Sequence, residues 1–268
     1  MKITPTPRIV YDKNPLIEVV CQIRFEPIED LGEIQHGMLE DFSHNQYVVH
    51  EQEQSFQFTV DISAETGMST PMRVPEMHIF HALTLNKSWQ ASFCREHLTL
   101  TCFKYENWID FLTRTLKLFE ILNKNYPEIK VQRIGLRYRN LIEREALGLA
   151  GTPWHELINP FLLGPLAHNA FSDTEIPSDA DVLSMLSQVM IKIEDCTLLL
   201  KSTLLSSIEG NEKAFLIDAD FLHEYDCEKN TIIDPDTLTQ KLEALHANAG
   251  SLFRRCIQEK LHHALHQN

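Results

Sequence analysis

The stretch VQRIGLRYRNLIE (131–143) carries three arginines on a segment that otherwise has the pattern of a buried strand. Side chains of a strand alternate between its two faces, so Arg133, Arg137 and Arg139 share one face with Gly135. The opposite face is apolar and consists of Ile134, Leu136 and Tyr138. Such a strand either holds an anionic ligand or pairs its arginines with carboxylates of the same protein.

The part of the chain before this strand reads as strand, helix, several strands and a long helix. Apolar and β-branched residues run almost without interruption through 15–25, which predicts a well-buried strand. Apolar residues at helical spacing follow at 28–42 and again at 107–126, where Asn107 is the expected cap and Pro127 the stop. The other expected elements are strands at 55–63, 77–85, 88–94 and 98–105 and a loop at 64–76.

After the strand at 131–143 the same order of strand, helix, several strands and long helix is repeated. A short helix is expected at 152–163, a loop at 168–181, and a final helix that starts at Asp234-Pro235 and continues to about 262. Strands are expected at 187–194, 197–206 and 213–222. We therefore predict an α+β protein with mostly antiparallel sheets and two similar halves, 1–128 and 129–268, forming one compact unit.

Two explanations of the halves remain open at this stage. In the first, the halves descend from a tandem duplication, and Arg24 and Arg137 then occupy equivalent positions on their two opening strands. In the second, the repeated order is only the ordinary alternation of elements in an α+β chain. The first half also has one more expected strand than the second.

Composition narrows the functional classes. The chain has 268 residues and a formal net charge of -14, which argues against broad binding to nucleic acid or to an anionic membrane. No apolar run approaches the ~20 residues that span a bilayer. The six cysteines are scattered without a CxxC pair, which indicates reduced thiols and no disulfide framework. We expect a cytoplasmic protein.

The candidate site residues are charged residues on strands. One set could bind an anion such as phosphate and consists of Arg24, Arg133, Arg137 and Arg139. Asp218 and Asp220 share a strand face and could hold Mg²⁺ with a phosphorylated substrate. The alternative explains both sets at once, because arginines on an inner strand need counter-charges. In that case Arg137 and Arg24 pair with carboxylates of neighbouring strands, Asp218 or Asp220 first among them.

The block YDKNPLIEVVCQIRF (11–25) resembles the beginning of a sporadically distributed, functionally uncharacterised family of bacterial proteins of about this length. That family begins with a tyrosine and a basic residue, followed by Pro-Leu-x-Glu-Val-x-x-Gln, an apolar residue, and Arg-Phe. The segments RIGLRYRNLI (133–142) and FLIDADF (215–221) also resemble family blocks in the same order. The resemblance implies a mobile or defence-associated gene context and implies no catalytic residue.

Catalytic and phosphate-binding motifs of the GxSxG, P-loop and GxGxxG kinds are absent from the sequence, and we expect no cofactor. The first hypothesis is a non-enzymatic interaction protein, a sensor, adaptor or neutraliser, whose partner is encoded by a neighbouring gene. It is expected to self-associate through Ile257, Leu261 and Leu265 at the end of the last helix. The second hypothesis is a binder or hydrolase of a phosphorylated ligand, such as a nucleotide or RNA end, at the arginine and aspartate strands.

Overall fold

Nine antiparallel strands form one sheet through the part of the chain that the structure describes. The computed structural model describes residues 1–268 except for 63–68, 168–175, 179–180, 207–212, 227–230 and 267–268. In chain order the strands are β1 (Leu16–Phe25), β2 (Val49–Ile62), β3 (Ser69–Leu83), β4 (Trp89–Phe93), β5 (His97–Cys102), β6 (Val131–Ile142), β7 (Met185–Ile193), β8 (Cys196–Ser206) and β9 (Lys213–Glu224). The order across the sheet is β2-β3-β4-β5-β1-β6-β9-β8-β7.

The pair β1 and β6 occupies the middle of this sheet. Cys21 lies opposite Leu136 and Ile23 opposite Ile134, and each of these four side chains is at most 2% exposed. Polar residues alternate with them on both strands, so one face of the pair is apolar and the other is charged. Both segments that the sequence predicted as well-buried strands, 15–25 and 131–141, therefore lie at the centre of the molecule.

The helices α2 (Trp108–Asn125) and α3 (Pro235–Cys256) lie on the apolar face of the sheet. Phe111 of α2 contacts Trp89 of β4 with ring centroids 5.9 Å apart, and His246 of α3 is hydrogen-bonded to Tyr138 of β6. The sequence predicted how both helices begin. The side chain of Asn107 accepts a hydrogen bond from the Asp110 N–H at the start of α2, and Asp234 caps α3 in the same way.

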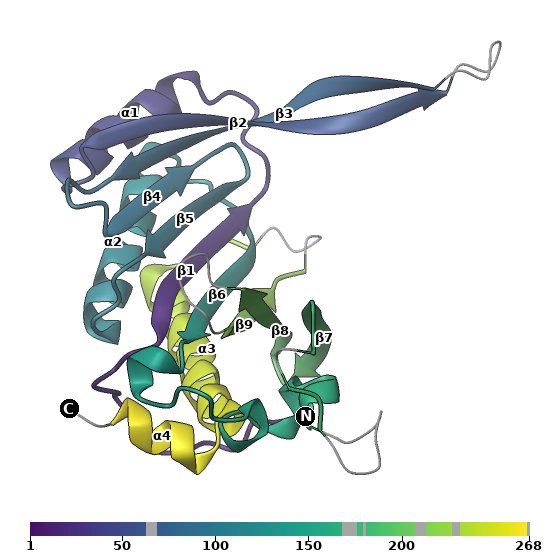
Figure 1. The fold of residues 1–268 in the computed structure, drawn as a ribbon. Helices are drawn as coiled ribbons and strands as arrows, with labels where there is room; N and C mark the ends of the chain where they lie inside the picture. Colours follow the sequence, from purple (N-terminus) through teal and green to yellow (C-terminus); the bar gives the residue numbers. More distant parts are fainter. Residues whose placement is uncertain (63–68, 168–175, 179–180, 207–212, 227–230, 267–268) are drawn as a thin grey trace.

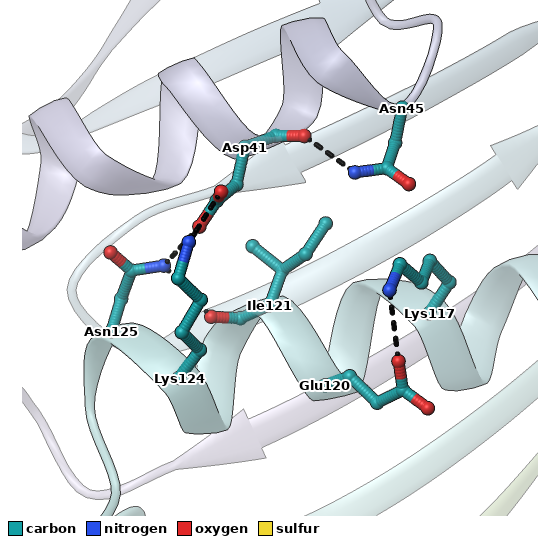
Figure 2. A network of polar contacts seen from close by, with 7 residues as sticks. All are labelled: Asp41, Asn45, Lys117, Glu120, Ile121, Lys124 and Asn125. Atoms are coloured by element: carbon teal, nitrogen blue, oxygen red, sulfur yellow. Dashed lines mark hydrogen bonds and ion pairs between the residues drawn. The ribbon is translucent and has the colours of Figure 1, made fainter.

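Helix α1 (Gly32–His44) packs against α2 beside the β2 to β5 side of the sheet (Figure 1). Figure 2 shows the polar contacts between the two helices: Lys124 and Asn125 of α2 donate hydrogen bonds to the carboxylate of Asp41 on α1. Gly37 permits this approach, because a Cβ at that position would overlap the side-chain oxygen of Asn125. A charged contact at the rim thus joins α1 to α2, next to the fully buried Met38 and Phe42 of α1.

All nine strands that the sequence predicted are present, and the mixed α+β class is confirmed. Two local expectations are wrong. The stretch 64–76 was expected to be a loop, but β3 already begins at Ser69, and β2 and β3 form a long hairpin that reaches beyond the rest of the sheet (Figure 1). The segment 152–163 contains the short 3-10 turns Trp154–Glu156 and Pro160–Leu162 in place of an α-helix. Residues 64–68 and most of 168–181 lie outside the described residues.

The C-terminal helix ends earlier than the sequence predicted. Helix α3 stops at Cys256, where Ile257 becomes extended and pairs with Ile158, and α4 (Glu259–Leu265) follows as a separate helix. Ile257, Leu261 and Leu265 are at most 3% exposed inside this single chain. The expectation that these residues contact a second copy is therefore wrong, because they already form part of the protein's own core.

Five cysteines are described, and all five are buried free thiols, as the sequence predicted. Burial raises the pKa of Cys21 and of Cys256 to about 12, which keeps both as neutral, unreactive thiols. None of the described helices is long and apolar enough to cross a membrane.

Candidate functional site

The two faces of β6 carry different polar side chains. Arg133, Arg137 and Arg139 lie on the face that points away from α2 and α3, together with Arg24, which is opposite Arg133 on β1. We call these four residues the arginine face. Tyr138 and Asn140 lie on the other face, beneath α3. The sequence identified the first face as a candidate site and read the second as apolar.

Arg137 forms a bidentate ion pair with Asp218. Its Nε donates to Oδ1 of Asp218 at 2.7 Å, and its Nη2 donates to Oδ2 of the same residue at 2.5 Å. The side chain of Asp218 is only 8% exposed, whereas that of Arg137 is 37% exposed. The pair crosses the sheet diagonally, because the residue directly opposite Arg137 is Asp220. The sequence-based expectation that Arg137 pairs with one of these aspartates is confirmed.

The other three arginines also have partners within the protein. Arg139 donates to Glu18 at 2.7 Å, Arg133 donates to the side-chain oxygen of Gln22 at 2.7 Å, and Arg24 reaches Glu96 at 3.3 Å. Glu18 and Gln22 come from β1, so both contacts tie β1 to β6. The partner of Arg24 lies at the turn before β5, and the two side chains are 47% and 27% exposed. Three of the four arginines are thus paired with a carboxylate, and Arg133 is hydrogen-bonded to an amide.

Asp220 lies opposite Arg137 and beside its ion pair with Asp218. Burial raises the pKa of its carboxyl, and the neighbouring Asp218 adds to the rise, while Arg137 and Arg133 oppose it. Both oxygens of Asp218 are engaged by Arg137, which leaves Asp220 alone to serve a metal ion. The described residues contain no group of three or more His, Cys, Asp or Glu side chains placed to hold one. This geometry gives the magnesium hypothesis no support.

A cavity of about 420 Å³ lies on the opposite side of β6, between the sheet, α3 and the N-terminal segment. We call residues 1–15 the N-terminal strap. The strap is fixed to the helices by a hydrogen bond from the Thr6 N–H to Ser251, by one from the Lys13 N–H to the carbonyl of Leu265, and by Tyr11, whose hydroxyl is hydrogen-bonded to His262. The volume lies within the range of small-molecule pockets.

A row of hydrogen-bonded aromatic residues lines one side of this cavity. The hydroxyl of Tyr138 and Nδ1 of His246 are 2.7 Å apart, and the imidazole of His246 stacks on Trp108 with ring centroids 4.0 Å apart and an angle of 5°. The indole N–H of Trp108 in turn donates to Glu243 at 2.8 Å. These residues come from β6, α3 and the first turn of α2, so three elements meet at the cavity.

The pKa values of the row suit recognition better than proton transfer. Burial, with a smaller contribution from the charge of Arg8, lowers the pKa of His246 to about 4. Burial also raises the pKa of Tyr138 well above its ordinary value. A general acid or base works best when its pKa is near the operating pH, and neither group meets this condition at neutral pH. The pair is therefore a fixed neutral hydrogen bond.

Three further residues distinguish the cavity from ordinary core packing. Asn140 lines it, is only 6% exposed, and forms no side-chain hydrogen bond with the described residues. Gly250 lines it from an exposed position in the C-terminal part of α3, and a Cβ there would meet no atom within 4 Å. Arg8 of the strap is exposed beside it, with no ion pair to any described residue.

Sequence reasoning missed the cavity, although two signals were present. Asn140 is a polar residue at a position of β6 where the alternation predicts an apolar one, and Gly250 is a glycine inside a long helix, where glycine is unfavourable. Neither signal indicates its partners, because the strap, β6 and α3 are far apart in the sequence. The cavity became visible only when the fold brought these segments together.

No protein-family model matches this chain, and a search of curated proteins finds no match either. The resemblance of residues 11–25 to the sporadic bacterial family therefore stays a prediction.

The Arg137–Asp218 pair can be tested with a double-mutant cycle in urea. Arg137→Ala and Asp218→Ala are each expected to lower the free energy of unfolding by about 2–3 kcal/mol, less than for a fully buried pair, because Arg137 is partly solvated. The coupling energy is expected to be about 1–3 kcal/mol. The exposed pair Lys117–Glu120 (Figure 2) is the control and should couple by less than about 0.5 kcal/mol. Equal coupling in the two cycles would contradict the structural role of Arg137.

The depressed pKa of His246 predicts a pH dependence of stability. In the unfolded chain this imidazole takes up a proton near pH 6.5, while in the folded protein it does so only near pH 4. Stability is therefore full above pH 6.5 and falls as the pH drops from 6.5 towards 4, because the unfolded state binds more protons there. Between pH 7 and 4.5 the wild type should lose on the order of 2 kcal/mol more than His246→Gln does.

Urea unfolding at a series of pH values measures this difference. The exposed His36 on α1 provides the control, since His36→Gln should leave the slope of the wild type unchanged. If His246→Gln has the same slope as the wild type, the imidazole is not held neutral by the cavity wall.

Proposed function

We propose that this protein is a non-enzymatic sensor that binds a small molecule in the cavity beneath the N-terminal strap. The observation that carries the proposal is Asn140. The residue is only 6% exposed, it lines the cavity, and its side-chain amide has no hydrogen-bond partner among the described residues. A hydrogen bond from a ligand to this unpaired amide would contribute about 0.5–1.5 kcal/mol.

The absent side chain at position 250 supports the same proposal. A glycine in a helix interior costs about 0.5–1 kcal/mol relative to alanine. Gly250 meets no neighbour that would exclude a side chain, so close packing does not explain it. Gly250 is exposed and lines the cavity, so we propose that its lack of a side chain keeps this side of the cavity open to a ligand.

A sensor must also transmit the binding of its ligand to another protein, and this requires an exposed interaction surface. Strand β7 is the last strand of the sheet, and no described strand pairs with its outer edge. Leu186, Val189 and Met190 of this strand are 67%, 44% and 65% exposed, and Lys192 is its one charged residue. Edge strands usually carry charges that prevent pairing with another chain. We propose that two copies pair through β7 as a homodimer.

The order of the sheet supports, as a further proposal, the tandem origin of the halves 1–128 and 129–268. In each half the last strand, β5 or β9, lies next to the first strand, β1 or β6, and a long helix follows. Strand β2 and the 3-10 turns after β6 are then later differences between the halves. We further propose that the protein belongs to the sporadic bacterial family and acts in the cytoplasm with a partner from a neighbouring accessory or defence gene.

The rival proposal places a phosphorylated ligand on the arginine face, where it would be bound or hydrolysed. A phosphate there must compete with Asp218 for Arg137 and with Glu18 for Arg139, both of which hold their arginines at 2.7 Å or less. The cavity requires no such exchange, since Asn140 and Arg8 have no partner to give up among the described residues. This difference favours the cavity.

The sensor proposal is tested by filling the cavity from α3. Gly250→Leu should abolish the increase in melting temperature that metabolite pools give with the wild-type protein, because the new side chain occupies the ligand's space. Without ligand the variant should be as stable as the wild type or more so, since it removes a helical glycine. Gly250→Ala is the control, with a smaller loss of binding. A ligand shift that Gly250→Leu leaves intact would contradict the proposal.

The dimer proposal is tested by light scattering at high protein concentration. The wild type should have twice the mass of the 31.0 kDa chain, and Leu186→Lys with Met190→Lys should return it to a monomer by placing like charges across the paired strands. Leu85→Lys, at an 81% exposed position remote from β7, should remain dimeric. A monomeric wild type would contradict self-association through this edge.

A further inference from the structure

We infer that the ligand of the cavity is a planar heteroaromatic anion, either a nucleoside monophosphate or a free heteroaromatic acid. The inference rests on the proposed function and specifies the chemistry of the molecule that the cavity takes. Three features of the lining carry it: the aromatic rings, the amide of Asn140 and the guanidinium of Arg8.

The rings favour a flat ligand. Aromatic side chains line the cavity from the strap, the β5–α2 connection, α2, β6 and α3; they are Tyr11, Tyr105, Trp108, Tyr138, His246 and Phe253. Trp108 and His246 stack on each other with an angle of 5°, so the wall that they form is flat. Base–aromatic stacking contributes about 1–3 kcal/mol per base, and a flexible aliphatic chain gains no such term.

The amide of Asn140 favours a heteroaromatic edge over a hydrocarbon. It presents a carbonyl acceptor and an NH₂ donor side by side, and such an amide can make two hydrogen bonds with a ring edge that carries a donor next to an acceptor. The backbone of Asn140 lies opposite Leu16 in the β1–β6 register, so the side chain is held by the centre of the sheet. A hydrocarbon ligand would leave this buried amide unmet.

Arg8 favours a negative charge on the ligand. It is the cation of the strap at the cavity, and its field already reaches the lining, since it lowers the pKa of His246 after the larger effect of burial. The other lining arginine, Arg254, is engaged by Glu259. Of the lining acids, Glu243 accepts the indole N–H of Trp108, and Glu106 is exposed at the rim. A phosphate or carboxylate is the natural partner of a free guanidinium.

The experiment measures dissociation constants with matched ligands by calorimetry. AMP is compared with adenosine to test the charge, and nicotinate is compared with nicotinamide for the same reason. Benzoate and cyclohexanecarboxylate match nicotinate in charge and size, and they test the ring nitrogen and the planarity. The remaining common nucleoside monophosphates, GMP, CMP and UMP, show which base edge fits Asn140. Binding of AMP but not nicotinate assigns the nucleotide, and the reverse assigns the free acid.

The anion should bind about tenfold more tightly than its neutral counterpart, and the aromatic acid more tightly than its saturated analogue. Arg8→Gln should remove the charge preference, and Asn140→Leu should weaken nicotinate to the level of benzoate. Arg95→Gln, at an exposed position outside the cavity lining, is the control and should change neither. The ligand pairs are compared on the wild-type protein as well, so the test stands even if Asn140→Leu does not fold.

Two kinds of failure are distinguishable. In the first kind, cyclohexanecarboxylate or adenosine binds as tightly as the planar anions, or no planar anion binds while other molecules give a shift in melting temperature that Gly250→Leu abolishes. The ligand class is then wrong and the sensor proposal stands. If no molecule at all gives a shift that depends on Gly250, the sensor proposal itself is wrong.

Discussion

The antiparallel pair of β1 and β6 is the interaction on which the rest of the structure depends. It lies at the centre of the sheet, so each of its strands is covered by a neighbouring strand on its other edge. Its register places Cys21, Ile23, Ile134 and Leu136 on one face and the arginines on the other. A slip by one residue would bring the arginines of β6 under α3 and expose the core, so the alternation itself holds the register.

The face of the β1–β6 pair on which a polar side chain lies decides whether it forms an ion pair or lines the cavity. Arginines on the outer face lie among strands that carry acids, and the pairing of Arg137 with Asp218 and of Arg139 with Glu18 follows from the need for counter-charge. Asn140 lies on the inner face, where α3 and the strap leave a space instead of a partner. The same strand therefore contributes closed ion pairs to the fold on one side and an open hydrogen-bonding group to a cavity on the other.

The sequence predicted the parts of this arrangement that depend on local pattern. The nine strands follow from alternation and β-branched residues, both ends of α2 follow from Asn107 and Pro127, and the start of α3 follows from Asp234. The choice of Asp218 over Asp220 was not predictable, because it depends on the diagonal reach of Arg137 across a twisted sheet. The stop at Cys256 escaped prediction because the helical pattern continues through it, and pairing of Ile257 with Ile158 interrupts it from elsewhere. The cavity likewise depends on contacts between segments distant in sequence.

The central claim is that ligands enter on the side of Asn140 and leave the arginine face untouched. Both faces of β6 can be observed in one ¹H–¹⁵N spectrum, through the side-chain amide of Asn140 and the Nε–H of Arg137. In a titration with AMP, GMP, CMP, UMP and nicotinate, the account predicts that the tightest-binding compound moves the Asn140 resonances and leaves that of Arg137 in place. Movement of the Arg137 resonance with no change at Asn140 would contradict the account and place the ligand on the arginine face.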